Sequence, residues 1–122
     1  MDSSVWVSFL QQGGDPFLAR LLMAQQVAMH DMVRGEVSMG SARQRQTALE
    51  LLPELPALPV AAHAEVMLLV DRHRLYGKGV GYVDAHLLTA VMLVPGILLW
   101  TKDKRLHAAA EQLGIAFVPS LY

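Results

Sequence analysis

Short apolar runs alternate with helical segments along this chain, and no other feature of the sequence restricts its fold as strongly. The runs are QVAMH (26–30), ALPV (57–60), ILLW (97–100) and IAFV (115–118). Their apolar and β-branched residues favour short extended strands. Strands separated by helices pair in parallel through right-handed crossovers, which place helices on the faces of the sheet. The sequence therefore predicts an α/β fold with a parallel β-sheet flanked by helices on both faces.

Helices are expected between these runs. Asp15, Asp31 and Ser41 are suitable N-cap residues, and Pro16 suits the first position of a helix. Gly40 is a suitable helix end. The expected helices cover residues 4–12, 16–24, 32–39, 42–52, 63–74, 83–94 and 102–113.

The length and composition fit a single domain over residues 1–122. Of the 122 residues, 53% are apolar, which is enough for one compact core. The net charge of −1 provides no overall attraction to nucleic acid, so a polyanionic ligand has to be met by a local basic patch. The absence of cysteine excludes disulfides, thiolate nucleophiles and zinc–thiolate sites.

Neither a secretory signal nor a membrane span is expected. The N-terminus lacks a basic segment followed by an apolar stretch. The most apolar region, residues 87–100, is interrupted by Pro95 and Gly96 and is shorter than the roughly 20 residues that span a bilayer. We therefore expect a cytoplasmic protein with no membrane partner.

Four carboxylates occupy positions from which they can converge. Asp2 precedes the first expected helix, Asp84 begins the helix after the glycine-rich loop LYGKGVGY (75–82), and Asp103 follows the run ILLW. Strand-to-helix junctions of a parallel sheet lie along one edge, so these side chains can meet there. Glu36 lies about one turn into its helix and can reach the same edge.

A cluster of four carboxylates is unfavourable unless a cation neutralises it, because like charges at short distance repel. Oxygen ligands alone select a hard divalent ion, so Mg²⁺ or Mn²⁺ is the expected cofactor. Such an ion can polarise a phosphodiester, activate a water molecule and stabilise the departing oxyanion.

The chain also resembles PIN-domain ribonucleases of the VapC toxin type. The resemblance lies in four segments that occur in the family's order and extend over nearly the whole chain: MDSSVWVSFL, MHDMVRGEVSMG, GVGYVDAHLL and LLWTKDKRLHAAAEQLGI. It implies that Asp2, Glu36, Asp84 and Asp103 are the catalytic, metal-binding acids. It also implies that Ser4 and Thr101 support these ligands or the water bound to them.

The same resemblance implies an activity and its partners. The activity is that of a metal-dependent endoribonuclease, the toxin of a toxin–antitoxin pair, which cleaves structured RNA with a metal-activated water. The implied partners are the RNA substrate, a VapB-type antitoxin that covers the acidic site, and a second copy of the chain in a homodimer.

The beginning of the chain departs from the family pattern. The family has an apolar strand before its first acid, whereas only Met1 precedes Asp2 in this sequence. We therefore expect a truncated first strand. An upstream start with apolar residues before Asp2 is favoured over an open slot in the sheet, because buried unpaired backbone groups cost on the order of 1–3 kcal/mol each.

Two groups of basic residues are candidates for holding RNA phosphates. One group lies before and within the glycine-rich loop and the other flanks Asp103, so both are expected to border the acidic edge. A solvated helix face is the alternative explanation for each. The residues are Arg72, Arg74, Lys78, Lys102, Lys104 and Arg105.

Other interpretations remain open from the sequence. Asp84 and Asp103 are well placed as helix N-caps and need have no further role. A phosphoacceptor receiver domain shares the architecture, but it needs paired acids after its first strand, and MDSSVW has one. A catalytically inactive PIN-fold module that binds RNA or protein is the main alternative, although all four acids are retained.

Overall fold

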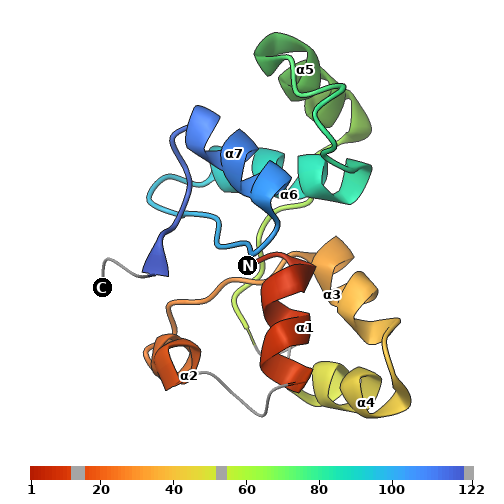
Figure 1. Ribbon diagram of the computed structural model, residues 1–122, viewed down its shortest axis with the longest axis vertical. Helices are drawn as coiled ribbons and strands as arrows, with labels where there is room; N and C mark the ends of the chain where they lie inside the picture. The colour runs from red at the N-terminus through yellow and green to blue at the C-terminus, as the bar shows by residue number, and fades with distance from the viewer. Residues whose placement is uncertain (12–15, 52–54, 120–122) are drawn as a thin grey trace.

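The computed structural model describes residues 1–11, 16–51 and 55–119, and these residues form two groups of helices (Figure 1). Helices α1, α3 and α4 contact one another in one group, and α5 contacts α6 in the other, beside α7. Contacts between α3 and α6 join the groups, and the N-terminus lies between them. The helices are α1 (Ser3–Gln11), α2 (Pro16–Met23), α3 (Asp31–Ser38), α4 (Ala42–Leu51), α5 (His63–His73), α6 (Tyr82–Leu93) and α7 (Lys104–Gln112).

All seven expected helices are present among the described residues, with ends within two residues of the expected ones. The cap of α4 is confirmed, because Ser41 Oγ accepts the N–H of Gln44 while Gln44 Oε1 accepts the N–H of Ser41. The expected cap at Asp31 is wrong by one residue. His30 has extended backbone angles, and its Nδ1 accepts the N–H of Met32 (3.1 Å). The expected cap at Asp15 lies outside the described residues.

The four expected strands are much reduced, and a continuous parallel sheet is not confirmed. The described residues contain two isolated parallel bridges, Met29 with Ala57 and Leu99 with Ala116. The pairing is parallel, as expected, but each run pairs along one edge through a single bridge. The described part of the chain is therefore mostly helical, with the two bridged pairs as the only paired extended segments within it.

Helix α6 forms the centre of the hydrophobic core. Every residue from 85 to 91 is buried, which is typical of a helix that is covered on all sides. Leu88 packs in one cluster with Trp6 of α1, Leu99 and Leu106 of α7, and each of the four exposes 1% of its surface or less. No helix in the described residues is both long enough and apolar enough to cross a membrane.

Candidate active site

Two hydroxyl groups fix the carboxylate of Asp2 just before α1. Ser4 Oγ donates to Asp2 Oδ1 (2.6 Å), and Thr101 Oγ1 donates to Asp2 Oδ2 (2.8 Å). Asp2 exposes 4% of its surface, so these hydroxyls replace water that its carboxylate has lost. Both residues that the resemblance suggests as supporting groups therefore contact Asp2.

The same hydroxyls join the beginning of the chain to the segment that leads into α7. Thr101 Oγ1 accepts the N–H of Asp103 (3.0 Å), and Ser4 Oγ accepts the N–H of Lys102 (3.0 Å). The two hydroxyl oxygens lie 3.3 Å apart. Segments at opposite ends of the sequence thus share one hydrogen-bond network around Asp2.

Replacing Thr101 with valine should destabilise the protein by about 1–3 kcal/mol. Valine has nearly the same shape, but it leaves Asp2 Oδ2 without its donor and the N–H of Asp103 without its acceptor. Chemical denaturation should measure the loss, and Thr101→Ser, which keeps the hydroxyl, is the matched control. Equal stability of the valine and serine variants would contradict the role that we assign to this hydroxyl.

Asp103 and Asp84 each use a carboxylate oxygen to hold a helix N-terminus. Asp103 is the N-cap of α7, and its Oδ1 accepts the N–H groups of Arg105 (2.9 Å) and Leu106 (3.1 Å), which confirms the cap interpretation. Asp84 is not the N-cap of α6, because that position belongs to Gly81. Its Oδ2 instead accepts the N–H of Gly81 (3.2 Å) from the third position of the helix. Both acids therefore have a structural role, which leaves room for a second role at the other oxygen.

The four acids are close enough to influence one another electrostatically. The pKa of Asp84 is raised, first by burial and then by the charges of Asp2 and Asp103, although the N–H of Gly81 opposes the shift. Partial loss of hydration around the carboxyl of Glu36 raises its pKa, even though the residue retains exposed surface. The charges of Asp84 and then Asp2 raise the pKa of Glu36 further. The four acids, which lie in or next to α1, α3, α6 and α7, thus form one region of negative charge.

The carboxylates of this region are suitable ligands for a cation, although they do not lie close enough together to hold one. Among the residues that the structure describes, no group of three or more His, Asp or Glu side chains is close enough to hold a metal ion. The donors are carboxylate oxygens, which hard divalent ions prefer. Burial and then the neighbouring carboxylates raise the pKa values of Glu36 and Asp84. The charge and donor type therefore fit Mg²⁺ or Mn²⁺.

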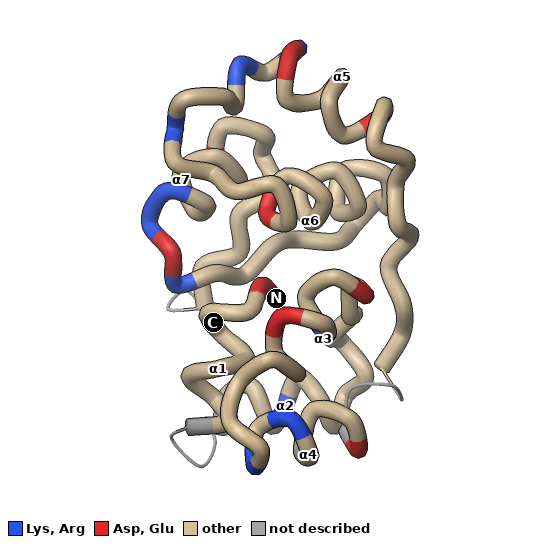
Figure 2. Tube along the Cα trace, turned by 90° about the vertical axis from the view of Figure 1, so that its right-hand side faces the viewer, with Lys and Arg blue, Asp and Glu red and all other residues tan. Residues whose placement is uncertain are grey.

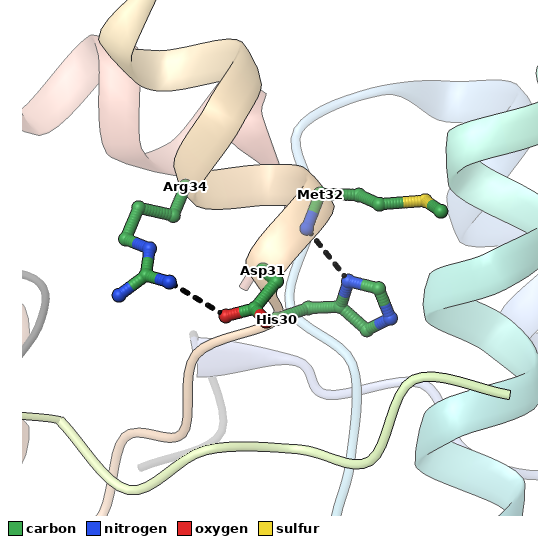
Figure 3. A network of polar contacts seen from close by, with 4 residues as sticks. All are labelled: His30, Asp31, Met32 and Arg34. Atoms are coloured by element: carbon green, nitrogen blue, oxygen red, sulfur yellow. Dashed lines mark hydrogen bonds and ion pairs between the residues drawn. The ribbon is translucent and has the colours of Figure 1, made fainter.

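His30 lies at the beginning of α3, facing α6 (Figure 3). Its side chain is fully buried. Burial and then the neighbouring His86 lower the pKa of His30, so a neutral ring is favoured. Asp31 points the other way and forms an ion pair with Arg34 (2.8 Å). His30 therefore serves as a helix cap, and Asp31 does not join the acidic region.

The basic residues named from the sequence lie along one side of the molecule. Figure 2 shows Lys and Arg following one another from the N-terminus of α7 towards the end of α5. Lys102 Nζ donates to Ser8 Oγ (2.7 Å), and Lys78 Nζ donates to Gln112 Oε1 (2.9 Å). The side chain of Arg105 passes so close to Gly79 that a Cβ at that position would clash with it. The glycine-rich loop and α7 thus form a common exposed surface, with Arg72, Arg74 and Lys104 exposed as well.

Two groups that hydrogen-bond to the acids were not predicted from the sequence. Ser3 hydrogen-bonds to Glu36 and lowers its pKa, which ties α1 to α3. The N–H of Gly81 has the same effect on Asp84. The sequence does contain a signal for Ser3. Ser3 and Ser4 are adjacent at a helix start, where consecutive side chains point in different directions, so their hydroxyls can contact different acids. A backbone N–H leaves no comparable signal in the sequence.

The chain is similar to two curated proteins, both described as "Ribonuclease VapC32", from the CDC 1551 / Oshkosh and ATCC 25618 / H37Rv strains of Mycobacterium tuberculosis. Each is 46% identical over 116 residues, which cover 95% of this chain and 93% of the relative. No protein-family model matches the chain, and no solved structure matches it.

Proposed function

The chain belongs to the VapC family of ribonuclease toxins, and from this premise we propose that it is a metal-dependent endoribonuclease. The observation that carries the proposal is the hydrogen-bond network in which Ser4 and Thr101 hold Asp2 beside the segment of Asp103. Glu36 and Asp84 lie near enough for the charge of Asp2 to raise their pKa values. The ribonuclease description of both relatives favours an enzyme over an inactive binding module and over a receiver domain.

Asp2, Glu36, Asp84 and Asp103 are the residues that would hold Mg²⁺ or Mn²⁺. When bound, such an ion lowers the pKa of a water molecule and stabilises negative charge on the phosphodiester oxygens. Asp2 is the best-oriented ligand, because Ser4 and Thr101 fix both of its oxygens. Asp103 has one oxygen outside the cap interactions, since the two backbone N–H groups go to Oδ1.

The basic side of the molecule would bind the RNA backbone. Lys102, Lys104 and Arg105 follow or flank Asp103 directly, so phosphates held by them lie next to the acids. Arg72 and Arg74 at the end of α5, and Lys78, which donates to Gln112 of α7, would provide further phosphate contacts. Cleavage of structured RNA fits this arrangement, since several phosphates can be contacted at once.

Membership of the VapC family supports two protein partners. One is a VapB-type antitoxin that covers the acidic site, and the other is a second copy of the chain. Exposed apolar residues offer surfaces for such contacts, with Met23 on α2 exposing 86% and Leu68 on α5 exposing 58% of their surfaces.

Metal-dependent cleavage of RNA by the purified chain is the experiment that tests this function. Incubation with structured RNA should give discrete fragments, because an endonuclease cuts at internal positions. A chelator should stop the reaction, and an excess of Mg²⁺ or Mn²⁺ should restore it. Fragments that persist undiminished in the chelator would rule out the metal-dependent mechanism, and intact RNA with the ion present would favour the binding module.

A further inference from the structure

Two buried histidines lie where α3 meets α6, and each has one nitrogen that lacks a hydrogen-bond partner within the described residues. These nitrogens are His30 Nε2 and His86 Nδ1. His30 is fully buried, His86 exposes 3% of its surface, and their ring centroids lie 6.2 Å apart. Figure 3 shows the His30 ring directed from the N-terminus of α3 towards α6. A buried polar atom without a partner is costly, so each of these nitrogens requires one.

The hydrogen bond at the other nitrogen of His30 makes Nε2 a donor. Nδ1 accepts the N–H of Met32 (3.1 Å), so Nδ1 carries a lone pair and no hydrogen. Burial lowers the pKa of His30 and favours the neutral ring, which carries a single hydrogen. That hydrogen is therefore on Nε2, and the partner that it requires is an acceptor.

The hydroxyl of Tyr82 limits His86 to two arrangements. This oxygen lies 2.9 Å from His86 Nε2 and 2.7 Å from His63 Nδ1. A hydroxyl has one hydrogen, so it donates to one of these nitrogens and accepts from the other. If it donates to His63, then Nε2 of His86 carries a hydrogen and Nδ1 is an acceptor. In the opposite arrangement a neutral His86 carries its hydrogen on Nδ1, which leaves two buried donors and no acceptor between them.

We propose that His30 Nε2–H and His86 Nδ1 are hydrogen-bonded as donor and acceptor, directly or through one bound water molecule. In this arrangement each of the two buried nitrogens satisfies the requirement of the other. The resulting chain of hydrogen bonds runs from the N-terminus of α3 through His86 and Tyr82 to His63, the first residue of α5. It therefore joins the two groups of helices through their interior.

This bond gives His30 and His86 a positioning role. Glu36 lies on α3 and Asp84 lies on α6, so a bond that fixes one helix against the other also fixes the distance between these two acids. A hydrogen bond restricts the two helices more strictly than apolar packing does, because it depends on direction as well as on distance. The positioning role rests on the proposed function, in which both acids hold a metal ion, whereas the bond itself does not.

Nuclear magnetic resonance of the imidazole nitrogens tests the bond without metal or RNA. In isotope-labelled protein, His30 and His86 should both carry their hydrogen on Nε2. Tyr82→Phe should leave the hydrogen of His86 on Nε2, because His30 still requires an acceptor. His30→Asn should give His86 a mixture of both forms, because the hydroxyl of Tyr82 can then reverse its direction. A wild-type His86 with its hydrogen on Nδ1, or a His86 that does not respond to His30→Asn, would overturn the proposal.

His30→Asn also separates the bond from the helix cap. Asparagine is a good N-cap residue that can still accept the N–H of Met32, but its side chain is too short to reach His86. This variant should bind Mn²⁺ roughly tenfold more weakly than wild type in titration calorimetry. Thr89→Val is the matched control, since it removes a buried hydrogen bond within α6, from Thr89 Oγ1 to the C=O of Ala85 (2.8 Å). The control should bind Mn²⁺ as tightly as wild type does.

The two measurements separate failure of the bond from failure of the metal site. Unchanged Mn²⁺ affinity in His30→Asn, or an equal loss in His30→Asn and Thr89→Val, would overturn the positioning role, since a general loss of stability would explain the second result. A wild-type chain that binds no Mn²⁺ would refute the metal site of the proposed function and the positioning role with it. The position of the hydrogen on His86 would still decide whether the bond exists.

Discussion

Replacing Asp84 with asparagine is expected to lower the rate of RNA cleavage by on the order of 100-fold or more. Loss of a residue that merely supports a metal ligand typically costs 10-fold to 100-fold, so loss of a ligand should cost at least as much. Asparagine keeps the size of the side chain and an oxygen that can accept the N–H of Gly81, so α6 should retain its N-terminus. Single-turnover cleavage at saturating Mn²⁺ measures the chemical step apart from binding.

The matched control for this substitution is Asp71→Asn on α5. Asp71 is exposed, and its side chain makes no hydrogen bond or ion pair within the described residues. The control should cleave RNA at the wild-type rate. If Asp84→Asn also cleaves at that rate while Asp2→Asn does not, the site is smaller than the four acids proposed here.

The helices follow from the sequence because their signals are local. Ser41 and Gln44 satisfy each other's backbone groups within one turn, and the apolar run of α6 requires burial whatever surrounds it. The displaced cap of α3 has a local cause as well. Asp31 and His30 both offer an acceptor, but the extended backbone ends at His30, so its ring takes the N–H of Met32.

The strands could not be predicted as reliably, because a strand is defined by its neighbours. The segments around Met29 and Leu99 have suitable residues, yet each forms a single parallel bridge within the described residues. The acids illustrate the opposite case. They are far apart in the sequence, and the rule that strand-to-helix junctions share an edge predicts that they meet. The mutual charge effects on Glu36 and Asp84 agree with that placement, although the metal ligands and their roles remain predictions.

Mg²⁺ or Mn²⁺ is expected to stabilise the folded chain substantially, whereas removal of one acid should stabilise the metal-free chain. Binding to the folded state alone contributes about 2.7 kcal/mol when the free ion is at 100 times its Kd. For a domain of this size, that corresponds to roughly 10 °C in melting temperature. Differential scanning calorimetry of wild type and Asp84→Asn, each with and without the ion, measures both effects. The variant should melt higher than wild type without metal and should gain much less when metal is added.

The pH dependence provides an independent check of the same charges. Because the pKa values of Glu36 and Asp84 are raised in the folded state, the folded chain binds protons that the unfolded chain has already released. Stability from these two groups is therefore complete below the ordinary carboxyl pKa of about 4 and is lost as pH rises through their folded pKa values. Metal-free wild type should lose more stability over this interval than Asp84→Asn. Saturating metal should reduce this difference, because the bound cation compensates the mutual repulsion of Glu36 and Asp84. The contrary result would be parallel curves of stability against pH for the two proteins, both without metal and with it. Such curves would mean that the acids neither repel one another nor share a cation.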